Sequence, residues 1–135
     1  MLMASGGTAM WFSRGKRTEV WDVPAPSPLG DIEAAQRIRE ICRAAFDSAE
    51  RIGGNGALSA RREKRERERY EGAARATMEI AMKMSDELMR DASVGDIVRF
   101  CMKANDVRTA KVLLRAIQAA SIKDDVLNEH PALGE

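Results

Sequence analysis

The chain has 135 residues, of which 32% are charged, yet 22 basic and 21 acidic side chains leave a net charge of only +1. This length fits one domain with flanking segments. Two cysteines and a single histidine exclude a disulfide-stapled secreted scaffold and a classical zinc site. Since the sequence has no run of about 18 apolar residues, we expect a cytoplasmic protein without a membrane span.

The composition favours helices over strands. Alanine, arginine, glutamate and methionine, which are strong helix formers, are abundant, whereas aromatic residues make up 4% of the chain. We therefore expect an all-α protein, a small helical bundle of about four helices with an extended N-terminal arm. One helix should be long and partly charged, and the core should be filled by aliphatic side chains, alanine and methionine.

Residues 1–30 are predicted to form the N-terminal arm. Prolines at positions 24, 26 and 28 favour a polyproline II spacer between this arm and the bundle. Trp11, Phe12 and Trp21 precede the spacer, and exposed tryptophan is unusual unless it docks. Three alternatives stay open: these aromatic side chains cover the chain's own helices, they dock on a neighbouring subunit or partner, or the arm is disordered.

The helical domain is predicted to span residues 31–122. Its first helix should run over 31–52, because Asp31 is a good N-cap and apolar residues, Ile32 among them, recur every three or four positions. A glycine-rich segment at 53–56 should stop this helix.

A long second helix is predicted over residues 58–91. Its C-terminal half carries a heptad-like seam and a second stripe of methionines, so this half should bury two faces. We expect an aspartate in place of Met84 or Leu88 to destabilise the fold strongly, because it would bury an unpaired charge. The seam consists of Tyr70, Ala74, Thr77, Ala81, Met84 and Leu88, and the stripe consists of Met78, Met82 and Met89.

Arginine and glutamate alternate in residues 61–75, near the start of this helix. Pairs four residues apart, such as Arg62–Glu66, let a solvated helix persist without a core. We therefore expect Glu66 to be exposed, and Glu66→Ala to cost less than about 1 kcal/mol. The local surplus of basic residues leaves phosphate binding as the alternative, through Arg61, Arg62, Arg65 and Arg69.

Two shorter helices are predicted over residues 94–105 and 107–122. Their connection favours a plain helical hairpin over a DNA-binding helix-turn-helix, because no glycine occupies the turn. Residues 123–135 should form a C-terminal tail in which Pro131 ends any order, and His130 would be a solvated residue of that tail.

No set of side chains in the sequence has the spacing of a catalytic centre. Cys42 and Cys101 fall on apolar helix faces, which is typical of buried thiols, and His130 lies outside the predicted helical domain. We therefore expect no enzymatic activity, no catalytic residues, no cofactor and no metal.

The sequence favours a non-enzymatic helical interaction or regulatory protein that self-associates, most simply as a dimer, with a protein partner as a further expectation. The alternative is a small nucleic-acid-binding protein that uses the 61–75 segment. The residues predicted to dock in the first hypothesis are Trp11, Phe12, Trp21, Met78, Met82, Met84, Leu88 and Met89.

Overall fold

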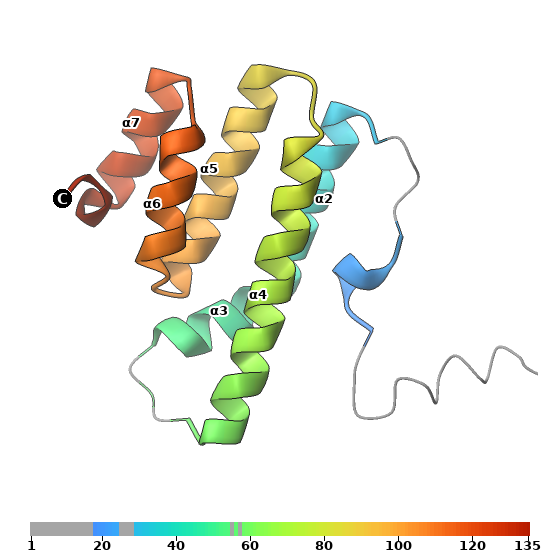
Figure 1. The fold of residues 1–135 in the computed structure, drawn as a ribbon, viewed down its shortest axis with the longest axis vertical. Helices are drawn as coiled ribbons and strands as arrows, with labels where there is room; N and C mark the ends of the chain where they lie inside the picture. Colours follow the sequence, from blue (N-terminus) through green and yellow to red (C-terminus); the bar gives the residue numbers. More distant parts are fainter. Residues whose placement is uncertain (1–17, 25–28, 55, 57) are drawn as a thin grey trace, which may run out of the picture.

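The computed structural model describes residues 18–24, 29–54, 56 and 58–135. This part of the chain forms six α-helices and two short 3-10 helices, with no strand (Figure 1). The all-α expectation is therefore confirmed, and the expected count of about four helices is corrected. The elements are η1 (Val20–Asp22), α2 (Asp31–Ala44), α3 (Phe46–Gly53), α4 (Ala60–Met82), α5 (Glu87–Lys103), α6 (Val107–Ala116), α7 (Ala120–Glu129) and η2 (Pro131–Gly134).

Helix α5 lies at the centre of the bundle. It packs against α2, α3 and α4 on one side and against α6 and α7 on the other (Figure 1). Its side chains are buried over most of the helix circumference, and even Gly95 is covered, by Ile122 and Val126 of α7. The core is mainly aliphatic, as predicted, and its largest fully buried side chains are Ile38, Ile41, Ile97, Ile117, Val98 and Val126.

The long helix predicted over residues 58–91 is in fact two helices. Helix α4 ends at Met82 and α5 begins at Glu87, so the helix predicted over 94–105 is the remainder of α5. The apolar spacing continues across the break because Met84, in the connection, is itself buried in the core. The spacing of apolar residues alone therefore does not indicate where α4 ends.

Aspartate side chains make this break. Asp86 is the N-cap of α5, and its carboxylate accepts a hydrogen bond from the Met89 backbone N–H at 2.8 Å. The carboxylate of Asp31, at the start of α2, accepts from the backbone N–H groups of Ser85 at 2.9 Å and Asp86 at 2.8 Å. These bonds satisfy backbone donors that a continuous helix would have paired internally.

The helix predicted over residues 31–52 also divides, at Ala45. The backbone there leaves the helical region, with φ −102° and ψ 8°, and α3 then turns back against α4. The Ala44 carbonyl at the break accepts a hydrogen bond of 2.7 Å from the Arg69 guanidinium of α4. A side chain from a distant helix thus stabilises the bend.

The C-terminal tail predicted over residues 123–135 is instead part of the bundle. Helix α6 ends at Ala116, and the buried carboxylate of Asp91 accepts from the backbone N–H groups of Gln118 at 3.0 Å and Ala119 at 2.8 Å. This contact positions α7, whose Val126 is fully buried. Pro131 begins η2 rather than ending all order, and His130 is half-buried at the junction.

Gly53 lies where α3 meets the end of α5, and it provides a first test of this packing. A Cβ atom at Gly53 would come 2.1 Å from the Lys103 carbonyl oxygen, whereas a Cβ at Gly56 would meet no atom within 4 Å. We expect Gly53→Ala to lower the free energy of unfolding by about 1–3 kcal/mol through overpacking. Gly56→Ala should change it by less than about 0.5 kcal/mol. Urea denaturation followed by circular dichroism measures both, and equal effects would contradict the packing of α3 on α5.

Candidate functional site

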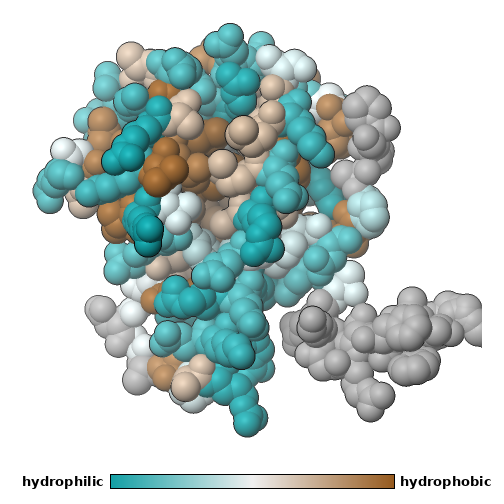
Figure 2. All heavy atoms as spheres, in the orientation of Figure 1, coloured by the Kyte–Doolittle hydropathy of each residue, from teal (hydrophilic) through white to brown (hydrophobic). Residues whose placement is uncertain are grey.

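A charged hollow of about 800 Å³ lies between α3, the N-terminal half of α4 and the η1 segment. Figure 2 shows that hydrophilic side chains cover this half of α4, in the lower part of the view. Five arginines and five carboxylates line the hollow, so their formal charges balance. The lining residues are Glu19, Trp21, Asp47, Arg51, Arg62, Arg65, Glu66, Glu68, Arg69, Glu71, Gly72 and Arg75.

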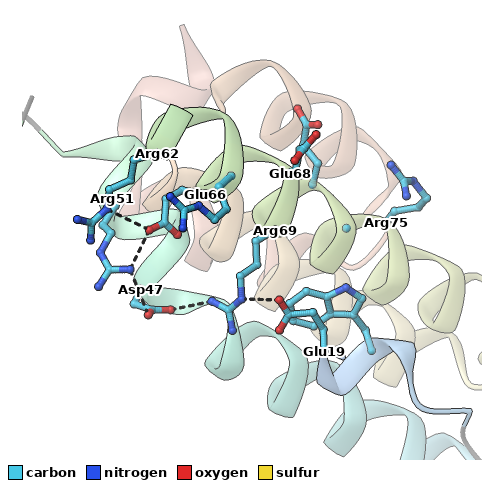
Figure 3. Close-up of a pocket in the computed structure, with 12 residues that line it drawn as sticks. Glu19, Asp47, Arg51, Arg62, Glu66, Glu68, Arg69 and Arg75 are labelled. Carbon is cyan, nitrogen blue, oxygen red and sulfur yellow. Dashed lines mark hydrogen bonds and ion pairs between the residues drawn. The ribbon is translucent and has the colours of Figure 1, made fainter. Parts of the chain in front are cut away.

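Arg69 joins four segments of the chain at the edge of this hollow (Figure 3). Its Nε donates to Glu19 at 2.9 Å, and its Nη1 donates to the Asp47 carboxylate at 3.0 Å and the Ser48 hydroxyl at 2.9 Å. Its Nη2 donates to the Ala44 carbonyl. Partial burial disfavours the charged form, but the bonds to Glu19 and Asp47 outweigh it and raise the pKa of Arg69. This guanidinium is therefore structural rather than free for phosphate.

Glu66 is buried, which corrects the expectation that it is exposed. Its Oε1 accepts from the Ser48 hydroxyl at 2.7 Å, its Oε2 accepts from Arg51 at 2.9 Å, and Arg62 lies 3.7 Å away (Figure 3). Burial opposes ionisation, but these hydrogen bonds and charges outweigh it and lower the pKa of Glu66. The sequence interpretation failed because it did not show that α3 folds back on α4.

We now expect Glu66→Ala to cost about 1–3 kcal/mol at neutral pH, because it removes the acceptor of the buried Ser48 hydroxyl and leaves Arg51 only its longer ion pair with Asp47. The folded-state pKa of Glu66 is lowered, so its stabilisation is present above the unfolded-state pKa of about 4.3 and is lost as the pH falls through the folded value. Unfolding titrations at pH 7 and at pH 3 should show the difference between variant and wild type shrinking in acid. Glu68→Ala is the matched control, since Glu68 is exposed and has no ion pair within the described residues. Its effect should stay below about 0.5 kcal/mol at both pH values.

The arginines predicted to bind phosphate divide into two groups. Arg69 is held in the internal network described above, and Arg62 lies beside Glu66. Arg61 and Arg65 are exposed and form no ion pair within the described ranges. The carboxylates of the hollow balance its arginines, which disfavours a polyanion at this place. Nucleic-acid binding through residues 61–75 stays a prediction.

Of the six residues predicted to dock that the structure describes, four are at least partly covered. Met84 is buried, and Met78 and Met89 are partly buried against the core. Met82 and Leu88, by contrast, are 73% and 62% exposed. Trp11 and Phe12 lie outside the described residues.

Ile32 corrects a further expectation. The sequence placed it on the buried face of its helix, but it is 61% exposed in the first turn of α2. Ile32 therefore joins Met82 and Leu88 as a large apolar side chain that faces solvent.

Trp21 packs against its own chain. We call residues 18–24, which contain η1, the strap. The Trp21 ring lies over the Arg69 guanidinium, 5.6 Å from its central carbon, and against Gly72 of α4. Arg37 of α2 donates through one nitrogen to the backbone carbonyls of Val20, at 3.1 Å, and Val23. For Trp21, the alternative of covering its own helices therefore holds in this structure.

Both cysteines are poor nucleophiles in the folded chain. Cys101 is fully buried and Cys42 is half-buried. Burial is the main cause that raises the pKa of Cys42 to about 12 and that of Cys101 to about 11. We expect a thiol reagent at pH 8 to label neither cysteine in the native protein, and to label both in guanidinium chloride. Mass spectrometry reads the labelling, and rapid native labelling would contradict the buried positions of these thiols.

In the part of the chain that the structure describes, no group of three or more His, Cys, Asp or Glu side chains is placed to hold a metal ion. The same residues contain no helix that is both long and apolar enough to cross a membrane.

Comparisons with protein families, curated proteins and solved structures found no match to this chain. The function proposed below rests on the geometry of its own residues.

Proposed function

We propose that this protein is a non-enzymatic helical interaction protein that self-associates, and that one end of its bundle is the contact surface. The observation that carries the proposal is the exposure of Ile32, Met82 and Leu88, each more than 60% open to solvent. Large apolar side chains that gather in one exposed region are typical of interaction sites. We call this region the apolar end.

The fold supports the grouping of these three residues. Helix α2 begins, α4 ends and α5 begins at the same end of the bundle, the upper end in Figure 1. The hydrogen bonds from Ser85 and Asp86 to the Asp31 carboxylate fix the start of α2 to the connection between α4 and α5. The apolar end is thus carried by helix termini that are tied together, and little ordering is needed before it docks.

A second copy of the chain fits this surface. In a two-fold dimer the same patch of both copies meets itself, so each apolar end would cover the other. Lys83 and Glu87 are exposed on the same connection and carry opposite charges, so an antiparallel arrangement can place one opposite the other. Three side chains bury a small area, and we therefore expect a concentration-dependent dimer rather than a permanent one.

Sedimentation equilibrium of the whole chain tests the proposal. The wild type should shift from monomer toward dimer as its concentration rises through about 1–100 μM. The double variant Met82→Glu/Leu88→Glu should stay monomeric while keeping its helical circular dichroism spectrum. Val112→Glu is the matched control, because Val112 is an exposed apolar residue on α6, and this variant should dimerise like the wild type. A wild type that stays monomeric at 100-fold the lowest concentration would refute the proposal.

A further inference from the structure

The strap is held on the bundle by few contacts. No residue of η1 is buried, and Val20 and Val23 are exposed. The strap is fixed by the Arg37 and Arg69 guanidinium groups and by the packing of Trp21. A segment with so little buried surface opens at a low free-energy cost compared with the core.

Each contact on the bundle side recognises a different property of the strap. Arg37 binds two backbone carbonyls, so it selects a short turn irrespective of side chains. Arg69 binds the Glu19 carboxylate at 2.9 Å and lies beneath the Trp21 ring, a cation–π contact. Together they suit a segment in which tryptophan follows an acidic residue by two positions.

Gly72 adds a feature that helix stability alone does not explain. Glycine inside a helix costs about 1 kcal/mol relative to alanine, and Gly72 lies within α4. A Cβ atom there would come 3.2 Å from the Trp21 Nε1 atom, closer than a side chain normally approaches. Because Gly72 has no side chain, it leaves room for the indole ring of Trp21. This position on α4 is therefore shaped to accept an aromatic ring.

We propose that Arg37, Arg69 and Gly72 form a docking groove for a tryptophan-containing acidic peptide segment of a partner protein, and that the strap is its intramolecular competitor. Arg69 pairs with the Glu19 carboxylate of the strap, so a carboxylate at this position of a partner segment would meet an opposite charge. This groove shares no residue with the apolar end, so it does not depend on self-association.

The covalent link between the strap and the bundle lowers the apparent affinity of the groove for a partner. A segment joined by a short linker competes at an effective concentration in the millimolar range. A partner's apparent affinity is reduced by the fraction of chains whose groove is open. Release of the strap should therefore expose the site without any other change in the bundle.

Fluorescence anisotropy with a labelled synthetic peptide tests this inference on the full chain. The probe has the sequence of residues 18–24, Thr-Glu-Val-Trp-Asp-Val-Pro. The strap variant Glu19→Ala/Trp21→Ala should bind it at least about tenfold more tightly than the wild type does. Adding Arg37→Ala to this variant should abolish binding. Val23→Ala is the matched control, since its carbonyl still meets Arg37, and it should behave like the wild type.

A peptide carrying Glu19→Gln and Trp21→Ala should bind no protein in the series. A strap variant that keeps its circular dichroism spectrum and melting temperature, yet does not bind the probe at about 1 mM, would overturn the proposal. Binding that survives Arg37→Ala would overturn it too. If Glu19→Ala/Trp21→Ala abolishes a wild-type dimer that Met82→Glu/Leu88→Glu leaves intact, the occupant is the strap of a second copy, and the separate partner is wrong.

Discussion

Arg69→Ala is expected to lower the free energy of unfolding by about 2–4 kcal/mol. The guanidinium bonds the strap through Glu19, the bend after α2 through the Ala44 carbonyl, and α3 through Asp47 and Ser48. Removing it breaks four hydrogen bonds at once, in a site where the arginine side chain is only 26% exposed. Chemical denaturation monitored by circular dichroism gives the value.

Two further variants separate the network from the charge. Arg69→Lys keeps the positive charge but cannot serve several acceptors in a fixed plane, so it should recover only part of the loss. Arg65→Ala, one turn earlier on α4 at an exposed position, should cost less than about 0.5 kcal/mol. Comparable losses for Arg65→Ala and Arg69→Ala would show that the general charge of α4 matters, and not the four-way contact.

Met84→Asp is expected to destabilise the protein by at least about 3 kcal/mol, because it places an unpaired carboxylate in the core between α4 and α5. Met84→Leu conserves the volume and should cost less than about 1.5 kcal/mol. Thermal and urea unfolding of both variants measure the difference.

Leu88→Asp is the matched control. The sequence predicted that this variant would be strongly destabilised, but the structure shows Leu88 exposed. Leu88 is exposed in the first turn of α5, where a negative charge interacts favourably with the helix dipole. We expect a change within about 0.5 kcal/mol. A loss as large as that of Met84→Asp would place Leu88 in the core, as the heptad-like seam had suggested.

Local patterns predicted the helices well and their ends poorly. The helical content, the aliphatic core and the Arg62–Glu66 contact all follow from spacing within one segment. The breaks depend on side chains far away in sequence, such as Asp31, which binds backbone groups 54 and 55 residues further on. Asp86 is the N-cap of α5 in the structure, but the apolar spacing through Met84 and Leu88 led us to predict one continuous helix there.

The candidate site was less predictable than the fold, for the same reason. Alternating charges in α4 indicate a solvated helix when only neighbours four residues apart are considered. The partners that bury Glu66 and engage Arg69 come from α3 and the strap, 15 to 50 residues away. The sequence singled out Trp21 because tryptophan is costly to expose, but it left open whether the ring packs on its own chain or elsewhere.

The central position of α5 implies two tiers of local opening. Helix α5 packs against all five other α-helices of the described chain, so we expect its central amides to be the best protected from solvent. Its amide hydrogens should thus exchange only through global unfolding, whereas those of the strap should exchange through small fluctuations. We therefore expect hydrogen exchange to separate a cooperative unit built around α5 from a strap that opens independently of it.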